Sequence, residues 1–167
     1  FAPGPDGGFT ARISYAVETS AFELTQLLNV MFGNTSLQPG IRVTELNLGE
    51  QLLSRFPGPR FGIAGLRRQL GVSNGPLLCA ALKPMGLSPQ ALAELAYQLA
   101  LGGIDIVKDD HGLSDQPFAP FHERVAACAA AVARANAETG RRTLYAPNIT
   151  APAPLIAERV RFAKDHG

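Results

Sequence analysis

The second half of the chain alternates apolar runs with helical patterns, and this rhythm limits the folds available to it. Three runs predict strands, and a helical pattern follows each of them. The strands are expected at 77–83, 104–109 and 143–148, and the helices at 89–101, 120–138 and from Pro154 onward. Strands that are apolar throughout are typical of a parallel sheet covered on both faces. The pattern therefore predicts an α/β fold, as an open doubly wound sheet or a (β/α)8 barrel.

The position of the polar residues favours the barrel. KPMGLS follows the first of these strands and is not a glycine-rich dinucleotide fingerprint. Polar residues gather instead where each strand ends, at Lys83, at 108–111 and at Asn148. In a barrel the catalytic groups lie at these carboxyl ends. Three strands cannot close a barrel, so this interpretation requires a longer chain.

The first part of the chain has a different pattern. Residues 9–17 alternate apolar and polar side chains and predict a strand, and 41–47 predict a second one. Between them a helix is expected over 21–32, with Ser20 as its N-cap. The stretch FPGPRF at 56–61 marks a boundary, and a short helix at 62–70 follows it. We expect part of an α+β domain over 1–60, a linker helix within 61–75 and the first part of a barrel over 76–167.

Composition excludes several classes of protein. The net charge is +1 and the sequence has no basic block, so no nucleic-acid partner is expected. The apolar runs are too short to span a membrane. Cys79 and Cys128 are expected to be free and reduced, which suits a cytoplasmic protein. The chain begins with Phe1 and stops inside a helical pattern, so we interpret it as a fragment of a longer protein.

The stretch GGIDIVKDDHGLSDQPF at 102–118 carries the chemistry. Side chains alternate along a strand, so Lys108 and Asp110 share one face, and Lys83 holds the equivalent position on the preceding strand. If these faces point into the barrel, the three side chains converge on one mouth. Asp109 is then expected to point toward the helices, while His111 lies just past the strand. On the helix 120–138, ordinary salt bridges on the outer surface are expected for arginines such as Arg124.

Two lysines near one carboxylate suit three interpretations. In the first, a lysine carrying CO₂ as a carbamate joins the carboxylate to hold Mg²⁺, which stabilises an enolate. In the second, a desolvated lysine forms a Schiff base with a ketone. In the third, Lys108 and Asp110 form a structural ion pair. The alternation of side chains does not choose between them.

Several motifs resemble the large subunit of ribulose-bisphosphate carboxylase (RuBisCO), and more closely the RuBisCO-like proteins. They are LKPMGLS at 82–88, GGIDIVKDD at 102–110, QPF at 116–118, AETG at 137–140 and NIT at 148–150, with weaker similarity back through FGN at 32–34. The resemblance implies an α+β, ferredoxin-like N-terminal domain followed by a (β/α)8 TIM barrel. This chain would hold part of the first domain and the first three β–α units of the barrel.

The resemblance also implies roles for single residues. Lys108 matches the lysine that is carbamylated to bind Mg²⁺, Asp110 matches a carboxylate ligand, and Lys83 matches the base that takes the proton from the sugar phosphate. Asn34 matches a residue that reaches the partner subunit's site, which implies a homodimer with shared active sites, or a higher oligomer. Apart from the resemblance, the position of Asn148 at the end of the third strand predicts that it binds substrate or a metal-bound water, or else makes a structural hydrogen bond.

Three departures from the RuBisCO pattern change the expected activity. His111 stands where RuBisCO has a glutamate ligand, and imidazole suits Mn, Fe or Zn better than Mg²⁺. His111 is therefore expected to bind another divalent metal, to act as a catalytic acid or base, or to support the metal ligands without binding the metal itself. The alternative is a solvated histidine in a loop. Met85 and Ala81 replace a lysine and a threonine at the mouth. We therefore expect a RuBisCO-like protein that does not fix CO₂.

These features lead to an expected function. The predicted enzyme is a metal-dependent decarboxylase or an isomerase/enolase, acting on a phosphorylated keto sugar or sugar acid through an enediolate. Within this class the altered ligand pattern and the absence of a lysine at position 34 point away from the methylthio-sugar enolases. The favoured prediction is a decarboxylase of a 3-keto sugar-acid phosphate. Two alternatives stay open: a Schiff-base aldolase using Lys83 or Lys108, and a non-catalytic dimeric homologue.

Overall fold

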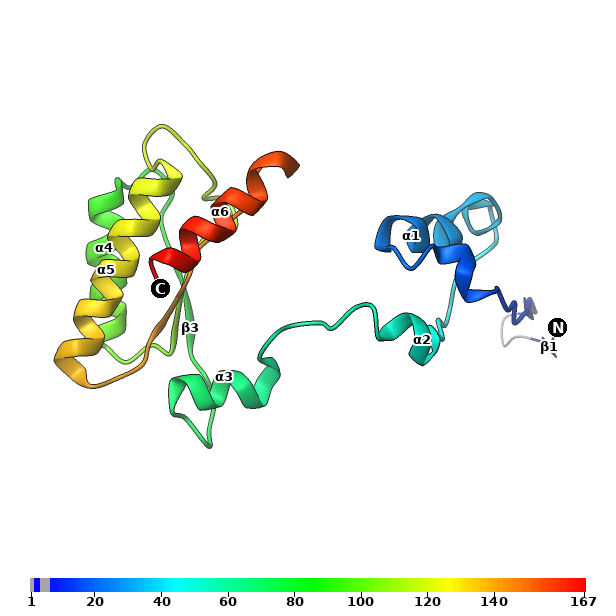
Figure 1. The fold of residues 1–167 in the computed structure, drawn as a ribbon, viewed down its shortest axis with the longest axis horizontal. Helices are drawn as coiled ribbons and strands as arrows, with labels where there is room; N and C mark the ends of the chain where they lie inside the picture. The colour runs from blue at the N-terminus through cyan, green and yellow to red at the C-terminus, as the bar shows by residue number, and fades with distance from the viewer. Residues whose placement is uncertain (1, 4–6) are drawn as a thin grey trace. The chain divides into compact units, whose positions relative to one another are not determined.

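The chain divides into two compact units, which are described separately. The structure is a computed structural model that describes residues 2–3 and 7–167, apart from the side chains of residues 34 and 35. The first unit is Phe1–Arg60 and the second is Phe61–Gly167 (Figure 1). Within the described residues no helix is both long and apolar enough to cross a bilayer.

The first unit consists mainly of short helices and irregular segments. Its elements in chain order are β1 (Ala2–Pro3), β2 (Phe9–Thr10), the 3₁₀ helix η1 (Val17–Ser20), α1 (Leu24–Phe32), the 3₁₀ helix η2 (Asn34–Leu37) and α2 (Gly49–Leu53). β1 and β2 form a short antiparallel pair. The predicted helix at 21–32 is therefore confirmed in its main part.

The two strands predicted in this unit are wrong. Of residues 9–17 only Phe9 and Thr10 form a strand, and 41–47 form none. A strand needs a hydrogen-bonding partner, and in the described part of this unit only β1 supplies one. Most of the alternating side chains remain exposed; Ile13, for example, is 64% exposed, and only Val17 at the end of the stretch is half-buried. The α+β, ferredoxin-like domain therefore stays a prediction.

The start of α1 also differs from the prediction. Ser20 does not cap it, because the Ser20 hydroxyl donates to the carbonyl of Val17 at 2.6 Å and closes η1. Ala21 and Phe22 then have φ angles of 50° and 56°. A right-handed helix does not contain such residues, since L side chains clash in the left-handed region. The helix consequently begins at Leu24.

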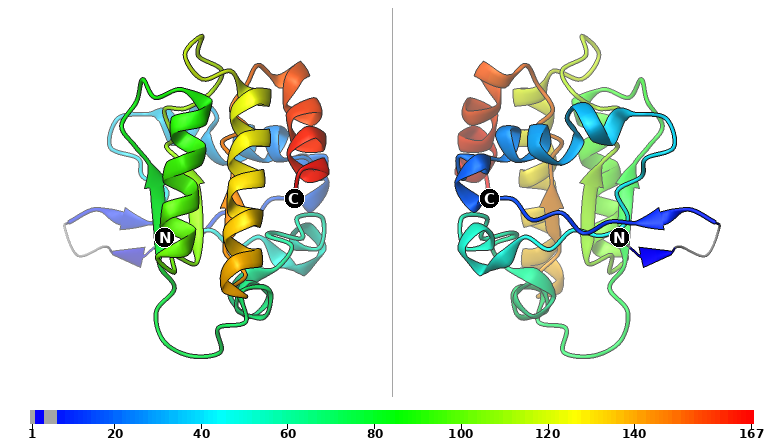
Figure 2. Two further views of the ribbon diagram at one scale, coloured as in Figure 1. Left: turned by 90° about the vertical axis from the view of Figure 1, so that its left-hand side faces the viewer. Right: turned by 90° about the vertical axis from the view of Figure 1, so that its right-hand side faces the viewer.

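The second unit follows the predicted β–α rhythm. Its elements are α3 (Gly62–Leu70), β3 (Cys79–Leu82), α4 (Pro89–Leu101), β4 (Ile106–Asp109), α5 (Phe121–Thr139), β5 (Leu144–Ala146) and α6 (Ala153–Asp165). The strands form one parallel sheet in the order β3-β4-β5. In Figure 2, α4 and α5 lie side by side against one face of this sheet. The predicted elements of this unit are confirmed to within a few residues at each end.

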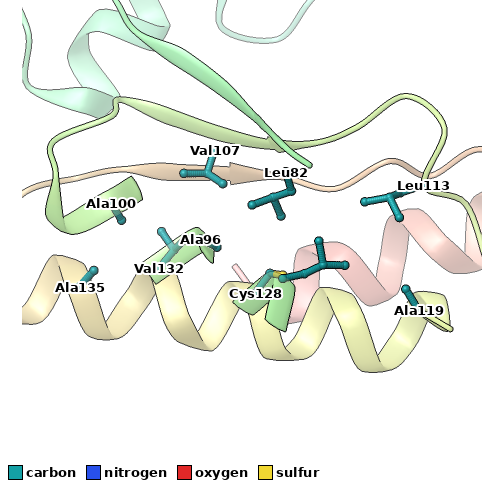
Figure 3. Packing of buried hydrophobic residues seen from close by; sticks show 10 residues of the cluster. Leu82, Ala96, Ala100, Val107, Leu113, Ala119, Cys128, Val132 and Ala135 are labelled. Carbon is teal, nitrogen blue, oxygen red and sulfur yellow. The ribbon is translucent and has the colours of Figure 1, made fainter. Parts of the chain in front are cut away.

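The core of the second unit lies between the sheet and the two helices α4 and α5. Figure 3 shows Leu82 of β3 and Val107 of β4 between the strands and these helices. Both residues are fully buried. The helices contribute mostly small or slender side chains to this cluster: Leu92, Ala96, Ala100, Cys128, Val132 and Ala135. Removing this apolar surface from water drives the packing and fixes which face of each strand points toward the helices.

The N-terminus of α4 provides a test of the local fold. The Ser88 hydroxyl accepts a hydrogen bond from the Ala91 amide at 3.2 Å, and Pro89 occupies the first turn. We expect Ser88→Ala to lower the free energy of unfolding by about 1 kcal/mol, because the Ala91 amide loses its acceptor. Ser88→Asp keeps an acceptor and should unfold close to the wild type. Urea unfolding of the full-length protein measures both. Equal midpoints for Ser88→Ala and the wild type would show that the cap contributes nothing.

Candidate active site

The ends of β3 and β4 bring two of the predicted site residues together. The strands pair in register with Leu82 opposite Asp109, so the next residue of each, Lys83 and Asp110, also lie side by side. The Lys83 Nζ is 3.2 Å from Asp110 Oδ2. The lysine side chain is 65% exposed and the aspartate side chain only 9%. A solvent-accessible amine therefore approaches a largely buried carboxylate at the carboxyl edge of the sheet.

Hydrogen bonds hold the Asp110 carboxylate in its charged form. Its Oδ1 accepts from the Gly112 amide at 2.9 Å and lies 3.5 Å from His111 Nδ1. The Gly112 amide and then the Lys83 ammonium lower the pKa of Asp110. Asp110 is thus an anionic oxygen donor under ordinary conditions, which is what a hard divalent cation requires.

Lys108 lies on the same face of the sheet but is not paired with Asp110. It is half-buried opposite Ala81, and its Nζ donates to the backbone carbonyl of Asp109 at 2.7 Å. The structural ion pair between Lys108 and Asp110 is wrong, since Asp110 pairs with Lys83 instead. The Lys108 amine thus has no carboxylate partner among the described residues.

The remaining predicted residues differ in how firmly they are held. The His111 side chain is 94% exposed. The Asn148 side chain makes hydrogen bonds within the chain. Its Nδ2 donates to the His111 carbonyl at 2.9 Å, and its Oδ1 accepts from the amide and hydroxyl of Thr150. The side chain of Asn34 lies outside the part of the chain that the structure describes.

The donor set decides whether a metal fits. The described residues contain no group of three or more His, Cys, Asp or Glu side chains that could hold one. Asp110 and His111 offer one carboxylate and one imidazole, and Lys108 shares a strand face with Asp110. A carbamate on Lys108 would add a second anionic oxygen. The residues therefore fit a divalent cation when Lys108 carries CO₂.

A buried ion pair behind the site was missed. Asp109 points toward the helices as predicted, but Arg124 does not lie on the outer surface of α5. Both side chains are 0% exposed, and Arg124 Nε is 3.1 Å from Asp109 Oδ2. The helical spacing indicates that Arg124 is buried. It lies three residues after Phe121 and four before Cys128, which share its helix face and are both fully buried.

The comparison with protein families decides where this chain belongs. The family model of the ribulose bisphosphate carboxylase large chain, catalytic domain, matches residues 62–167. The chain belongs to this family. This RuBisCO-like chain is 45% identical over 160 residues to 5-methylthioribulose-1-phosphate isomerase from Rhodospirillum rubrum, which covers 95% of this chain and 43% of that protein. It is 40% identical over 159 residues to 2,3-diketo-5-methylthiopentyl-1-phosphate enolase from Geobacillus thermodenitrificans, with 93% and 38% covered. It thus spans about two fifths of these relatives' length.

Solved structures agree with this assignment. The crystal structure of a Rubisco-like protein from Rhodopseudomonas palustris matches with a TM-score of 0.85 and 50% identity, over 91% of this chain and 44% of that chain. The dimeric archaeal Rubisco from Hyperthermus butylicus matches with a TM-score of 0.79 and 33% identity, over 87% and 35%. The fold is RuBisCO-like, mixed α/β, and consistent with a TIM-barrel catalytic domain.

The charge pair at the site gives a measurable titration. We expect Lys83→Met to raise the pKa of Asp110 toward its usual value, but not fully, because the Gly112 amide remains. Because folding lowers this pKa, the ionised carboxylate stabilises the fold above its unfolded pKa of about 4. That contribution is lost as the pH falls through the lowered value. Carboxyl ¹³C NMR titration of the full-length protein measures the shift, with Lys164→Met as the control. An unchanged Asp110 pKa in Lys83→Met would contradict the pairing.

Proposed function

We propose that this chain is part of a RuBisCO-like enzyme that enolises a phosphorylated keto sugar through an enediolate and does not fix CO₂. The observation that carries the proposal is the approach of the Lys83 amine to the Asp110 carboxylate at the carboxyl ends of adjacent parallel strands, with Lys108 on the same face. Catalytic groups of (β/α)8 barrels lie at this edge. Because the chain spans about two fifths of the length of the relatives it matches, the activity is proposed for the whole protein.

The proposed roles follow from the chemistry of each side chain. Lys83 takes the proton from the carbon beside the substrate carbonyl, after its ammonium has first released a proton to solvent. Its exposed position leaves room for a substrate to approach. Lys108 as a carbamate, Asp110 and His111 would hold a divalent cation, either Mg²⁺ or a metal that accepts nitrogen more readily. When bound, the cation supplies positive charge beside the developing enediolate oxygen.

The relatives favour isomerisation or enolisation over the decarboxylation expected from the sequence. One is named an isomerase of 5-methylthioribulose 1-phosphate and the other an enolase of a diketo methylthiopentyl phosphate. In an isomerisation Lys83 returns the proton to the neighbouring carbon, so no group leaves. We propose 5-methylthioribulose 1-phosphate as the first substrate to test. Asn148 is proposed to lie beside the substrate, where its bond to the His111 carbonyl also holds the turn.

The proposed assembly is a homodimer in the cytoplasm. A structural relative is described as dimeric. Asn34 is proposed to reach the active site of the partner subunit, as the family resemblance implies. A phosphorylated small molecule is then bound between two chains, with no nucleic acid or membrane involved.

The carbamate can be detected directly. The full-length protein with ¹³C-bicarbonate and Mg²⁺ should show a carbamate carbonyl signal by ¹³C NMR. We expect this signal to disappear in Lys108→Ala, because the amine that binds CO₂ is gone, and to remain in Lys83→Met. A signal that survives in Lys108→Ala would assign the carbamate elsewhere. No signal in the wild type would favour the Schiff-base or non-catalytic interpretation.

Proton abstraction gives the second test. With 5-methylthioribulose 1-phosphate in D₂O, the wild-type full-length enzyme should exchange deuterium into the carbon beside the carbonyl, followed by ¹H NMR. Lys83→Met should slow this exchange by at least about 100-fold, because the base is lost. Lys164→Met is the control and should exchange normally.

Other outcomes would replace the proposal. Release of CO₂ from a keto sugar-acid phosphate would identify a decarboxylase. Trapping of the substrate on a lysine by borohydride would identify a Schiff-base aldolase. A protein with no metal-dependent turnover of any phosphorylated keto sugar would be the non-catalytic homologue.

A further inference from the structure

A fully buried carboxylate lies directly behind the candidate site. Asp109 follows Lys108 and precedes Asp110, but its side chain points to the other face of the sheet. Its Oδ2 accepts from Arg124 Nε at 3.1 Å and from the backbone amide of Asn148 at 2.9 Å. Its Oδ1 accepts from the Tyr145 hydroxyl at 2.7 Å. One carboxylate thus joins the strands β4 and β5, the helix α5 and the loop after β5.

The arginine extends this network into the loop between β4 and α5. Arg124 Nη1 donates to the carbonyl of Ala119 at 2.8 Å, and Nη2 donates to the carbonyl of Ser114 at 2.9 Å. The planar guanidinium therefore fixes two points of this loop relative to Asp109. A lysine has no fork of donors that could make these contacts at once.

The loop after β5 extends the network to the turn that carries the candidate ligands. The backbone amide of Asn148 is bonded to Asp109, and its side-chain Nδ2 donates to the His111 carbonyl at 2.9 Å. On the other side of the turn, Gln116 Nε2 donates to the Gly112 carbonyl at 2.7 Å. The segment 110–112 is consequently held by groups whose own positions depend on Asp109 and Arg124.

Burial makes each member of this network sensitive to the others. Tyr145 is packed against the core beside Asp109, and burial raises the pKa of its phenol, so the hydroxyl remains a donor. A buried carboxylate that loses a donor is left partly unsatisfied, and the groups around it rearrange to compensate. Because Arg124 donates to two carbonyls of the β4–α5 loop and Asp109 accepts from the Asn148 amide, we expect such a rearrangement to displace the loops on either side of the site.

We propose that Asp109, Arg124 and Tyr145 are positioning residues, which set the geometry of the turn 110–112 for cation binding through Asn148 and the β4–α5 loop. The inference rests on the proposed function, since it assigns these residues to the cation site formed by Lys108, Asp110 and His111. Groups that orient metal ligands in this way typically change metal affinity by 10- to 100-fold when they are removed.

Tyr145→Phe tests the network most directly, because it removes the hydroxyl that donates to Asp109 and changes no charge. The control is Tyr97→Phe, since the Tyr97 hydroxyl also donates to a carboxylate, that of Glu138 at 2.6 Å, on the exposed side of α4 and α5. Mn²⁺ binding to the full-length protein with bicarbonate is measured by electron paramagnetic resonance. We expect about a tenfold loss of Mn²⁺ affinity in Tyr145→Phe and no change in Tyr97→Phe.

A second measurement needs no metal. Hydrogen–deuterium exchange followed by mass spectrometry reports peptides that cover 110–119, and these should exchange faster in Tyr145→Phe than in the wild type or Tyr97→Phe. Arg124→Lys keeps the charge beside Asp109 but not both loop contacts, and it should accelerate exchange over 113–119 further. Thermal unfolding of each variant shows how much of the change is a general loss of stability.

The outcomes separate this inference from the proposed function. If Tyr145→Phe and Tyr97→Phe lose similar thermal stability while Mn²⁺ affinity and exchange at 110–119 stay as in the wild type, the network is only structural and the inference is wrong. If the wild type binds no Mn²⁺ in bicarbonate, the proposed function fails. In that case unchanged exchange at 110–119 in Tyr145→Phe still shows that the positioning role is wrong. Faster exchange would show that the network holds the turn 110–112, without a role in cation binding.

Discussion

The parallel pairing of β3 with β4 is the constraint on which the rest of the second unit depends. Its register places Leu82 opposite Asp109 and therefore Lys83 beside Asp110. Side chains alternate with a period of two, so a slip of one residue would move every side chain to the other face. Lys108 would then point into the apolar layer against α4 and α5, where an unpaired charge is costly. The burial of Leu82 and Val107 thus also orients the charged residues of the site.

This alternation gives two neighbouring aspartates opposite environments. Asp109 points into the protein, where its charge needs a buried positive side chain and hydrogen-bond donors. The Arg124 guanidinium and the Tyr145 hydroxyl provide them. Asp110 points to the opposite face, where it accepts from one backbone amide and pairs with one exposed lysine. A buried ion pair is weak support for stability, because desolvation offsets most of the attraction. Arg124 also donates to the carbonyls of Ser114 and Ala119, which indicates that the pair holds the loop between β4 and α5.

The sequence predicted the second unit well because its signals are local. The Ser88-Pro89 start of α4 and the glycine after α5 act within one turn of the helix, and the structure keeps both. The alternation over 9–17 was equally clear, yet a strand forms only where a partner lies beside it, which local pattern does not specify. Alternation predicted that Lys83 and Asp110 share a face, and the pairing of β3 with β4 places them side by side. Their roles in catalysis come from the family resemblance and stay a prediction. Arg124 was missed because arginines on helices are mostly exposed, and only its spacing from Phe121 and Cys128 reveals its burial.

The two side chains after β4 differ in how they are held, and this bears on the choice of metal. The Asp110 carboxylate is bonded to the Gly112 amide within its own turn, so its direction is fixed before any ligand arrives. The His111 ring is almost fully exposed, and the turn is held through the His111 carbonyl rather than through its imidazole. If Lys108 carries a carbamate, its oxygen and the Asp110 oxygen define the cation site. The His111 imidazole would lose rotational freedom on binding the same cation. The oxygens would then govern whether a cation binds, and His111 would govern how strongly nitrogen-accepting metals are preferred over Mg²⁺.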